Sequence, residues 1–191
     1  MLKNVARKIS DNQDNYNIDN ISDAVDLIHF KNKYFEVNKK EVLIVKIAKE
    51  MGFDIYSCNF DKNTFSAICI SPDAKLKFGC DKIIMINTNI PAVYKRFALA
   101  FEIGNYLFNF KNSISNIEYY KYSTYDEIFS ESLINKFASE LLVPKKLFVK
   151  EYESMKSHGD IDYYEIASQM SKIFNVPIKI IFTLIYKYEN I

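Results

Sequence analysis

The segment from Pro91 to Phe110 constrains the fold more than any other part of the 191-residue chain. Its side chains are apolar on nearly every side of a helix, so we expect a helix at about 91–110 that runs through the core. Proline suits the first turn of such a helix. The few interior polar residues follow one another at i, i+3 and i+7, which places Glu102, Asn105 and Asn109 on one stripe of its surface.

Three segments before this helix have the pattern of short strands. Residues 53–58 alternate, residues 64–70 are β-branched and apolar, and residues 82–87 form a short run typical of a buried strand. A helix is expected ahead of them at about 39–51, because apolar side chains recur there every three residues and Gly52 supplies a left-handed stop.

The segments around the central helix are predicted to be irregular or helical. A loop is expected to begin at Ser71, and residues 111–126 are polar and irregular. A second core-facing helix is expected at about 127–142, ended by Pro144. Three further helices are predicted at about 145–155, 162–174 and 178–189.

Together these patterns predict an α+β fold, with a small three-stranded sheet packed against the central helix and further helices at both ends. We expect an N-terminal arm or weak helix at 1–35, a core at 36–146, and C-terminal helices at 147–191 that pack on this core. A chain of this length supports one hydrophobic core, so we expect one domain overall.

Charge and cysteine content indicate the environment of the protein. The 25 basic and 24 acidic residues leave a net charge of +1, so no global field draws the chain to nucleic acid or an anionic membrane. The beginning of the chain lacks a signal-peptide stretch, and the longest apolar-rich run, 97–108, is too short to span a bilayer. Three cysteines without a C-x-x-C pair are expected to be reduced. We therefore expect a soluble, cytoplasmic protein with no membrane partner.

A DNA-binding module is one possible function of this chain, and the sequence supports it only weakly. The last two predicted helices resemble a helix-turn-helix in spacing, but residues 178–184 are too apolar for a recognition helix that faces phosphates. Core packing is the better interpretation of this helix, and nucleic acid is not an expected partner.

Two blocks of this sequence resemble one known family. The run from Arg96 to Leu107, RFALAFEIGNYL, resembles the active-site helix of ImmA/IrrE-type zinc metallopeptidases, roughly R-F-x-x-A-H-E-x-G-H-x-L. The run at 133–144, LINKFASELLVP, resembles the second block of that family, E-A-N-x-F-A-A-x-L-L-M-P. The resemblance covers about 41–146 and, loosely, 160–189. It implies a metallopeptidase-like fold whose active-site helix is the central helix of this chain.

The resemblance also implies where a metal site would lie. Two histidines one helical turn apart and a glutamate on the second helix hold zinc in that family, and a carboxylate between the histidines is the general base. In this chain the three ligand positions are Phe101, Asn105 and Leu133, and only the base position, Glu102, is kept. The implied protein is a degenerate member that binds no zinc, needs no cofactor and has no catalytic residue beyond the remnant Glu102.

Glu102 itself has two interpretations. A general base without a metal or an activated nucleophile has nothing to act on, so we favour a partly buried carboxylate satisfied by hydrogen bonds. Asn105, one turn along, is placed to donate its amide to it. Phe101 and Leu133 are both large and apolar, and we expect them to pack together and fill the former metal cavity. The alternative is an active metallopeptidase with an unorthodox site around Glu102.

Four tyrosines, Tyr119, Tyr120, Tyr122 and Tyr125, lie between the two helices of the former active site. Tyrosine offers a large contact area at low entropic cost and is enriched at binding sites, so these residues are candidates for contact with a partner. Folding back onto the domain is the alternative. The sequence thus predicts a catalytically inactive pseudopeptidase that binds another protein. The family context implies a regulator or inhibitor encoded by a prophage or other mobile element, with a repressor or a host defence factor as its target.

Overall fold

The computed structural model describes residues 25, 42–110, 119–128, 130, 132–157 and 162–189. The predicted arm at 1–35 lies outside these residues apart from Val25. The elements in chain order are α3 (Ile44–Glu50), β1 (Asp54–Cys58), β2 (Thr64–Ile70), α4 (Pro72–Phe78), β3 (Lys82–Asn87), α5 (Ala92–Asn105), the π-helical turn η3 (Tyr106–Phe110), β4 (Tyr119–Thr124), α6 (Tyr125–Ile128), α7 (Leu133–Leu142), α8 (Lys145–Lys156), α9 (Tyr163–Phe174) and α10 (Ile178–Glu189).

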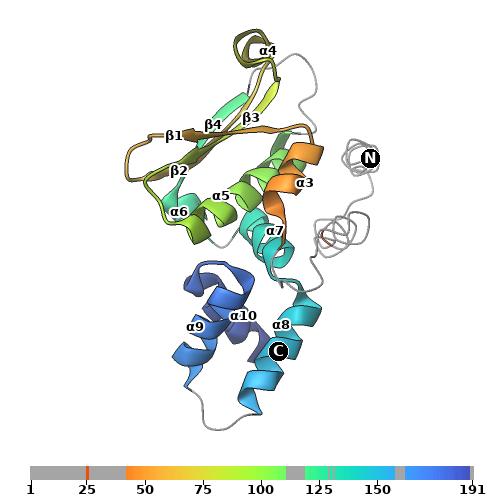
Figure 1. The fold of residues 1–191 in the computed structure, drawn as a ribbon, viewed down its shortest axis with the longest axis vertical. Helices are drawn as coiled ribbons and strands as arrows, with labels where there is room; N and C mark the ends of the chain where they lie inside the picture. The colour runs from red at the N-terminus through yellow and green to blue at the C-terminus, as the bar shows by residue number, and fades with distance from the viewer. Residues whose placement is uncertain are drawn as a thin grey trace.

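The sheet has four strands in the order β1-β3-β2-β4. β1 runs parallel to β3, whereas β2 runs antiparallel to both β3 and β4. α3 and α5 lie together on one side of this sheet, and α4 lies at its end (Figure 1). This mixed architecture confirms the predicted α+β class.

Strand β4 corrects the prediction of three strands. The sequence predicts an irregular segment at 111–126, but residues 119–124 pair with β2 from Ile70 opposite Tyr119 to Thr64 opposite Thr124. Tyrosine and threonine favour strands, yet apolar and polar residues alternate only weakly in this segment. Its strand conformation therefore depends on the partner strand, which a local pattern does not reveal.

Two helix boundaries also differ from the sequence prediction. α4 replaces the loop expected from Ser71, whose hydroxyl caps the helix by accepting a hydrogen bond from the backbone N–H of Asp73 at 3.1 Å. Gly79, at φ 77°, ends it in the left-handed region. The helix expected at 127–142 is divided into α6 and α7, because Ser132 caps a new helix start. The signals for both boundaries are local caps, not apolar periodicity.

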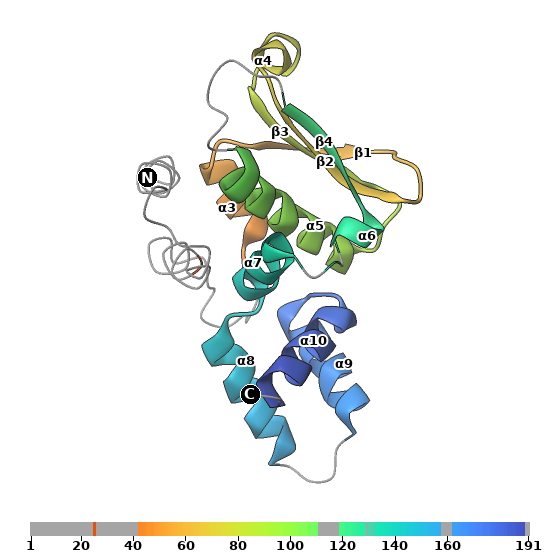
Figure 2. The ribbon, with the colours of Figure 1, turned by 180° about the vertical axis from the view of Figure 1, so that it is seen from behind.

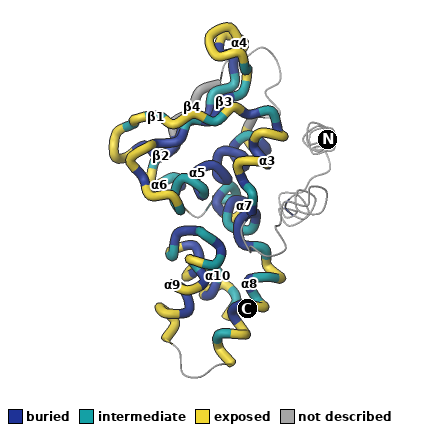
Figure 3. The backbone as a smooth tube through the Cα atoms, viewed as in Figure 1, coloured by how far each residue is buried: buried dark blue, intermediate teal, exposed yellow. Residues whose placement is uncertain are grey.

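α5 is the central helix, as its composition predicts. Residues 97–105 are all buried, and Figure 3 shows most of this helix in the colour of buried chain. The two helices approach closely at Gly104, where an added Cβ would lie 2.9 Å from Cδ1 of Phe137 and 3.0 Å from Cγ2 of Ile134. Glycine is therefore required at this position by the packing of α7 on α5.

The C-terminal helices α8, α9 and α10 lie at the opposite end of the molecule from the sheet (Figure 2). Their bounds confirm the predicted helices to within a residue or so. Arg96 of α5 links this end to the rest, since its Nε donates to the carbonyl of Asn175 at 3.1 Å and its Nη2 donates to the carbonyl of Val42 at 2.9 Å. None of the helices in the described ranges has the length and apolar character needed to cross a membrane.

Glu189, at the end of α10, fastens the three C-terminal helices to one another. Its carboxylate accepts hydrogen bonds from Lys156 at 2.7 Å, Tyr152 at 2.5 Å and Tyr163 at 2.8 Å. The bond from Lys156, followed by those from the two tyrosines, lowers the pKa of Glu189 to about 2. Burial, and then the same carboxylate, raise the pKa of Tyr152 above its ordinary value.

We expect Glu189→Gln to lower the melting temperature at neutral pH, because it removes the negative charge at this junction. The folded-state pKa lies below the ordinary 4.5, so the carboxylate stabilises the fold above that pH and loses this effect as the pH falls towards 2. The gap in melting temperature between wild type and variant should therefore narrow through this window. Glu165→Gln, on exposed α9 surface, is the control and should melt with the wild type. Equal melting of Glu189→Gln and wild type at neutral pH would contradict the assignment.

Candidate functional site

The polar stripe of α5 and η3 forms a chain of hydrogen bonds that runs from the core to the exposed Asn109. Glu102 and Asn105 are both completely buried. The Glu102 carboxylate accepts from the Ser66 hydroxyl of β2 at 2.6 Å and from the Asn105 amide at 2.9 Å. The Asn105 carbonyl oxygen in turn accepts from the Asn109 amide at 3.1 Å. The predicted donation from Asn105 to Glu102 is confirmed, and the carboxylate is more deeply buried than the sequence suggested.

The sheet supplies a second serine beside this carboxylate. Ser66 of β2 is paired with Ser123 of β4, and both residues are completely buried. Ser66 bonds to Glu102, whereas the Ser123 hydroxyl has no hydrogen-bond partner within the described chain. The two serines are therefore alike in burial and strand position, but they differ in that Ser66 donates a hydrogen bond to the Glu102 carboxylate and Ser123 does not.

The residues at the three ligand positions do not fit a zinc ion. Phe101 is a core residue and Leu133 is half-buried, and neither side chain has a lone pair to donate. Both ends of the Asn105 amide are engaged in hydrogen bonds. In the part of the chain that the structure describes, no three His, Cys, Asp or Glu side chains are grouped to hold a metal. His29 and His158 lie outside that part.

The predicted contact between Phe101 and Leu133 stays a prediction. Phe101 belongs to the core cluster, and Leu133 packs against the margin of that cluster. Leu133 also lines a groove on the other side of α7, so its side chain is not enclosed between the two helices in the manner of a core residue.

The four candidate tyrosines do not lie on a loop. Tyr119, Tyr120 and Tyr122 lie on β4, at an end of the strand order, and Tyr125 begins α6. Tyr125 is 43% exposed, and its ring lies 5.4 Å from that of Phe65 and 5.9 Å from the ammonium of Lys179. The structure thus brings one of the four tyrosines next to α10.

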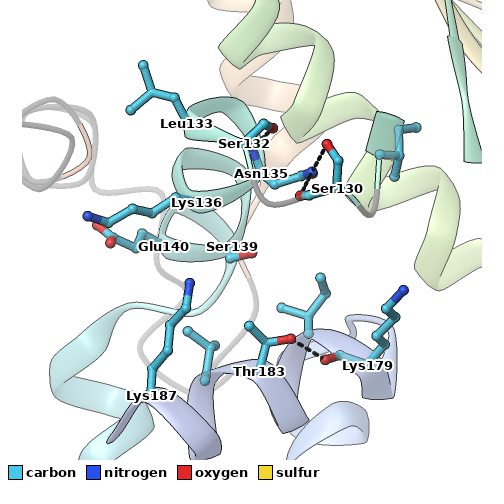
Figure 4. Close-up of a pocket in the computed structure, with 13 residues that line it drawn as sticks. Ser130, Ser132, Leu133, Asn135, Lys136, Ser139, Glu140, Lys179, Thr183 and Lys187 are labelled. Carbon is cyan, nitrogen blue, oxygen red and sulfur yellow. Dashed lines mark hydrogen bonds between the residues drawn. The ribbon is translucent and has the colours of Figure 1, made fainter. Parts of the chain in front are cut away.

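A groove that sequence reasoning missed lies between α7 and α10 (Figure 4). Its volume is about 530 Å³, and Lys136, Lys179 and Lys187 are among the residues that line it. We call it the α7–α10 groove. Each lysine is an ordinary exposed residue of its own helix, and only the packing of the two helices brings them together. No sequence signal reports that packing.

Comparison with known proteins agrees with the fold. The family model of the IrrE N-terminal-like domain, a peptidase family, matches residues 48–181. This chain belongs to that family. The IrrE-like match includes α5 and α7, which carry the two resembling blocks, and extends through α9 into α10. A search of the curated proteins found no relative that matches.

We expect Ser66→Ala to lower the free energy of unfolding of this IrrE-like domain by about 1–3 kcal/mol, because it removes a donor from a buried carboxylate. Urea denaturation measures the change. Ser123→Ala is the matched control, at the same burial on the neighbouring strand. It removes a hydroxyl that has no partner among the described residues, so it should be neutral or slightly stabilising. Equal destabilisation by the two substitutions would mean that strand packing, not the bond to Glu102, is decisive.

Proposed function

We propose that this chain is a catalytically inactive member of the IrrE-like family that acts by binding another protein. The observation that carries the proposal is the set of side chains at the ligand positions, Phe101, Asn105 and Leu133. The family resemblance assigns zinc to those positions, and an ion needs lone pairs that two of the three side chains lack.

The contacts of Glu102 support the same conclusion. A general base must reach the proton it abstracts and must exchange it with a reacting group. Here one carboxylate oxygen is bonded to Ser66 and the other to Asn105, at zero exposure. These contacts give Glu102 a structural role, in which it joins α5 to β2.

A peptidase fold that lacks the zinc ligands of its family suggests a role in the recognition of another protein. The resemblance implies that active relatives in mobile elements relieve repression by cleaving a repressor. We propose that this chain binds such a repressor, or a host defence factor, without cutting it. The contact candidates from the sequence are Tyr119, Tyr120, Tyr122 and Tyr125, and the exposure of Tyr125 supports the choice of that residue.

The first test restores the ligands. We expect Phe101→His, Asn105→His and Leu133→Glu together to bind about one zinc per chain and to melt at a higher temperature with zinc than with EDTA. The wild type should carry no stoichiometric zinc by mass spectrometry of the metal, and EDTA should not change its melting. The double variant without Leu133→Glu is the control and should bind zinc more weakly. Stoichiometric zinc in the wild type would overturn the proposal in favour of an active site around Glu102.

The second test separates binding from cleavage. Wild type and Glu102→Gln should capture the same partner from the native host, and mass spectrometry should find that partner at full length with both. Circular dichroism checks that the variant is folded. A partner that is shortened by the wild type but intact with Glu102→Gln would identify Glu102 as a general base and contradict the proposal.

A further inference from the structure

The α7–α10 groove has an apolar floor and a basic rim. Ile128 and Ile180 are buried beneath it, and Leu133 and Leu184 are half-buried at its sides. Figure 4 shows Lys179, Thr183 and Lys187 of α10 facing Lys136, Ser139 and Glu140 of α7. An occupant must therefore combine an apolar group with hydrogen-bonding or charged groups.

The charge of the groove differs from that of the chain. Three lysines and one glutamate line it, although the whole chain has 25 basic and 24 acidic residues. Among the described residues, the ammonium groups of Lys136 and Lys187 have no hydrogen-bond or ion-pair partner. Both side chains are exposed, so carboxylates can reach them at little cost in desolvation.

A buried amide adds a requirement that a simple anion does not meet. Asn135 lines the groove and uses its Nδ2 to donate to the carbonyls of Glu127, at 3.0 Å, and Ser130. Its Oδ1 is buried and has no hydrogen-bond partner in the described chain. An acceptor of this kind is matched by an N–H donor, which a peptide carries and a phosphate or carboxylate ion does not.

We propose that the α7–α10 groove binds an acidic peptide segment of the partner protein, with one aliphatic side chain on its floor and carboxylates at Lys136, Lys179 and Lys187. The inference rests on the proposed role in protein binding and names the chemistry of the partner. Lys179 also lies 5.9 Å from the ring of Tyr125, so the groove adjoins this exposed candidate tyrosine.

Fluorescence anisotropy with the full chain tests the assignment. The probe is a fluorescein-labelled twelve-residue peptide of glutamate and glycine with one central leucine. We expect Lys136→Glu with Lys187→Glu to weaken its binding about tenfold or more, and added salt to weaken binding to the wild type. Lys145→Glu with Lys146→Glu, at the exposed start of α8, changes the net charge equally and should leave the affinity unchanged. Thermal melting checks that both variants are folded.

Two further probes test the parts of the occupant. A peptide with glutamine in place of glutamate, and a peptide with glycine in place of leucine, should each bind more weakly than the parent. The assignment is overturned if the parent peptide does not bind, if both lysine pairs weaken it equally, or if duplex DNA competes for the groove with higher affinity.

Mass spectrometry of the peptide after incubation keeps this inference separate from the proposed function. An intact peptide that binds in the groove supports both. Cleavage of a peptide that still requires Lys136 and Lys187 for binding would contradict the proposed catalytic inactivity but would support the groove as the binding site. An intact peptide whose binding ignores those lysines would overturn the groove alone.

Discussion

The buried carboxylate of Glu102 is the constraint to which the neighbouring elements are adapted. A charge in the core is tolerated only with hydrogen-bond donors around it, and they come from two directions, Ser66 of the sheet and Asn105 of the same helix. α5 cannot rotate or slide along β2 without separating these groups. The position of α5 in turn sets that of α7, which contacts it closely at Gly104. One polar contact thus fixes the register between sheet and helices.

Much of the fold follows from the sequence because the governing signals are local. The central helix is recognisable because its side chains are apolar on nearly every side, and the last three helices because apolar residues recur in them at helical spacing. The bond between Asn105 and Glu102 also follows from spacing, since residues three apart on a helix share a face. In each case the evidence for the structure lies within one segment of chain.

The sequence predictions fail where contacts between distant segments determine the conformation. β4 is a strand because β2 offers it an edge, and its own residues alternate too weakly to announce it. The α7–α10 groove depends on two helices about forty residues apart, whose lysines look like ordinary solvated charges when each helix is considered alone. The tyrosines illustrate the same limit, because Tyr125 acquires a neighbour in Lys179 only through the tertiary packing.

Arg96 stabilises the position of α10, one of the two helices that form the groove. Its guanidinium donates hydrogen bonds to two backbone carbonyls, that of Val42 just before α3 and that of Asn175 in the left-handed turn that leads into α10. A displacement of this turn and α10 away from α5 would break the charge-assisted hydrogen bond from Arg96 to Asn175. The place of α10 beside α7 is therefore supported by a side chain that does not itself line the groove, so a substitution at Arg96 would alter the shape of the groove without removing any group that a ligand contacts.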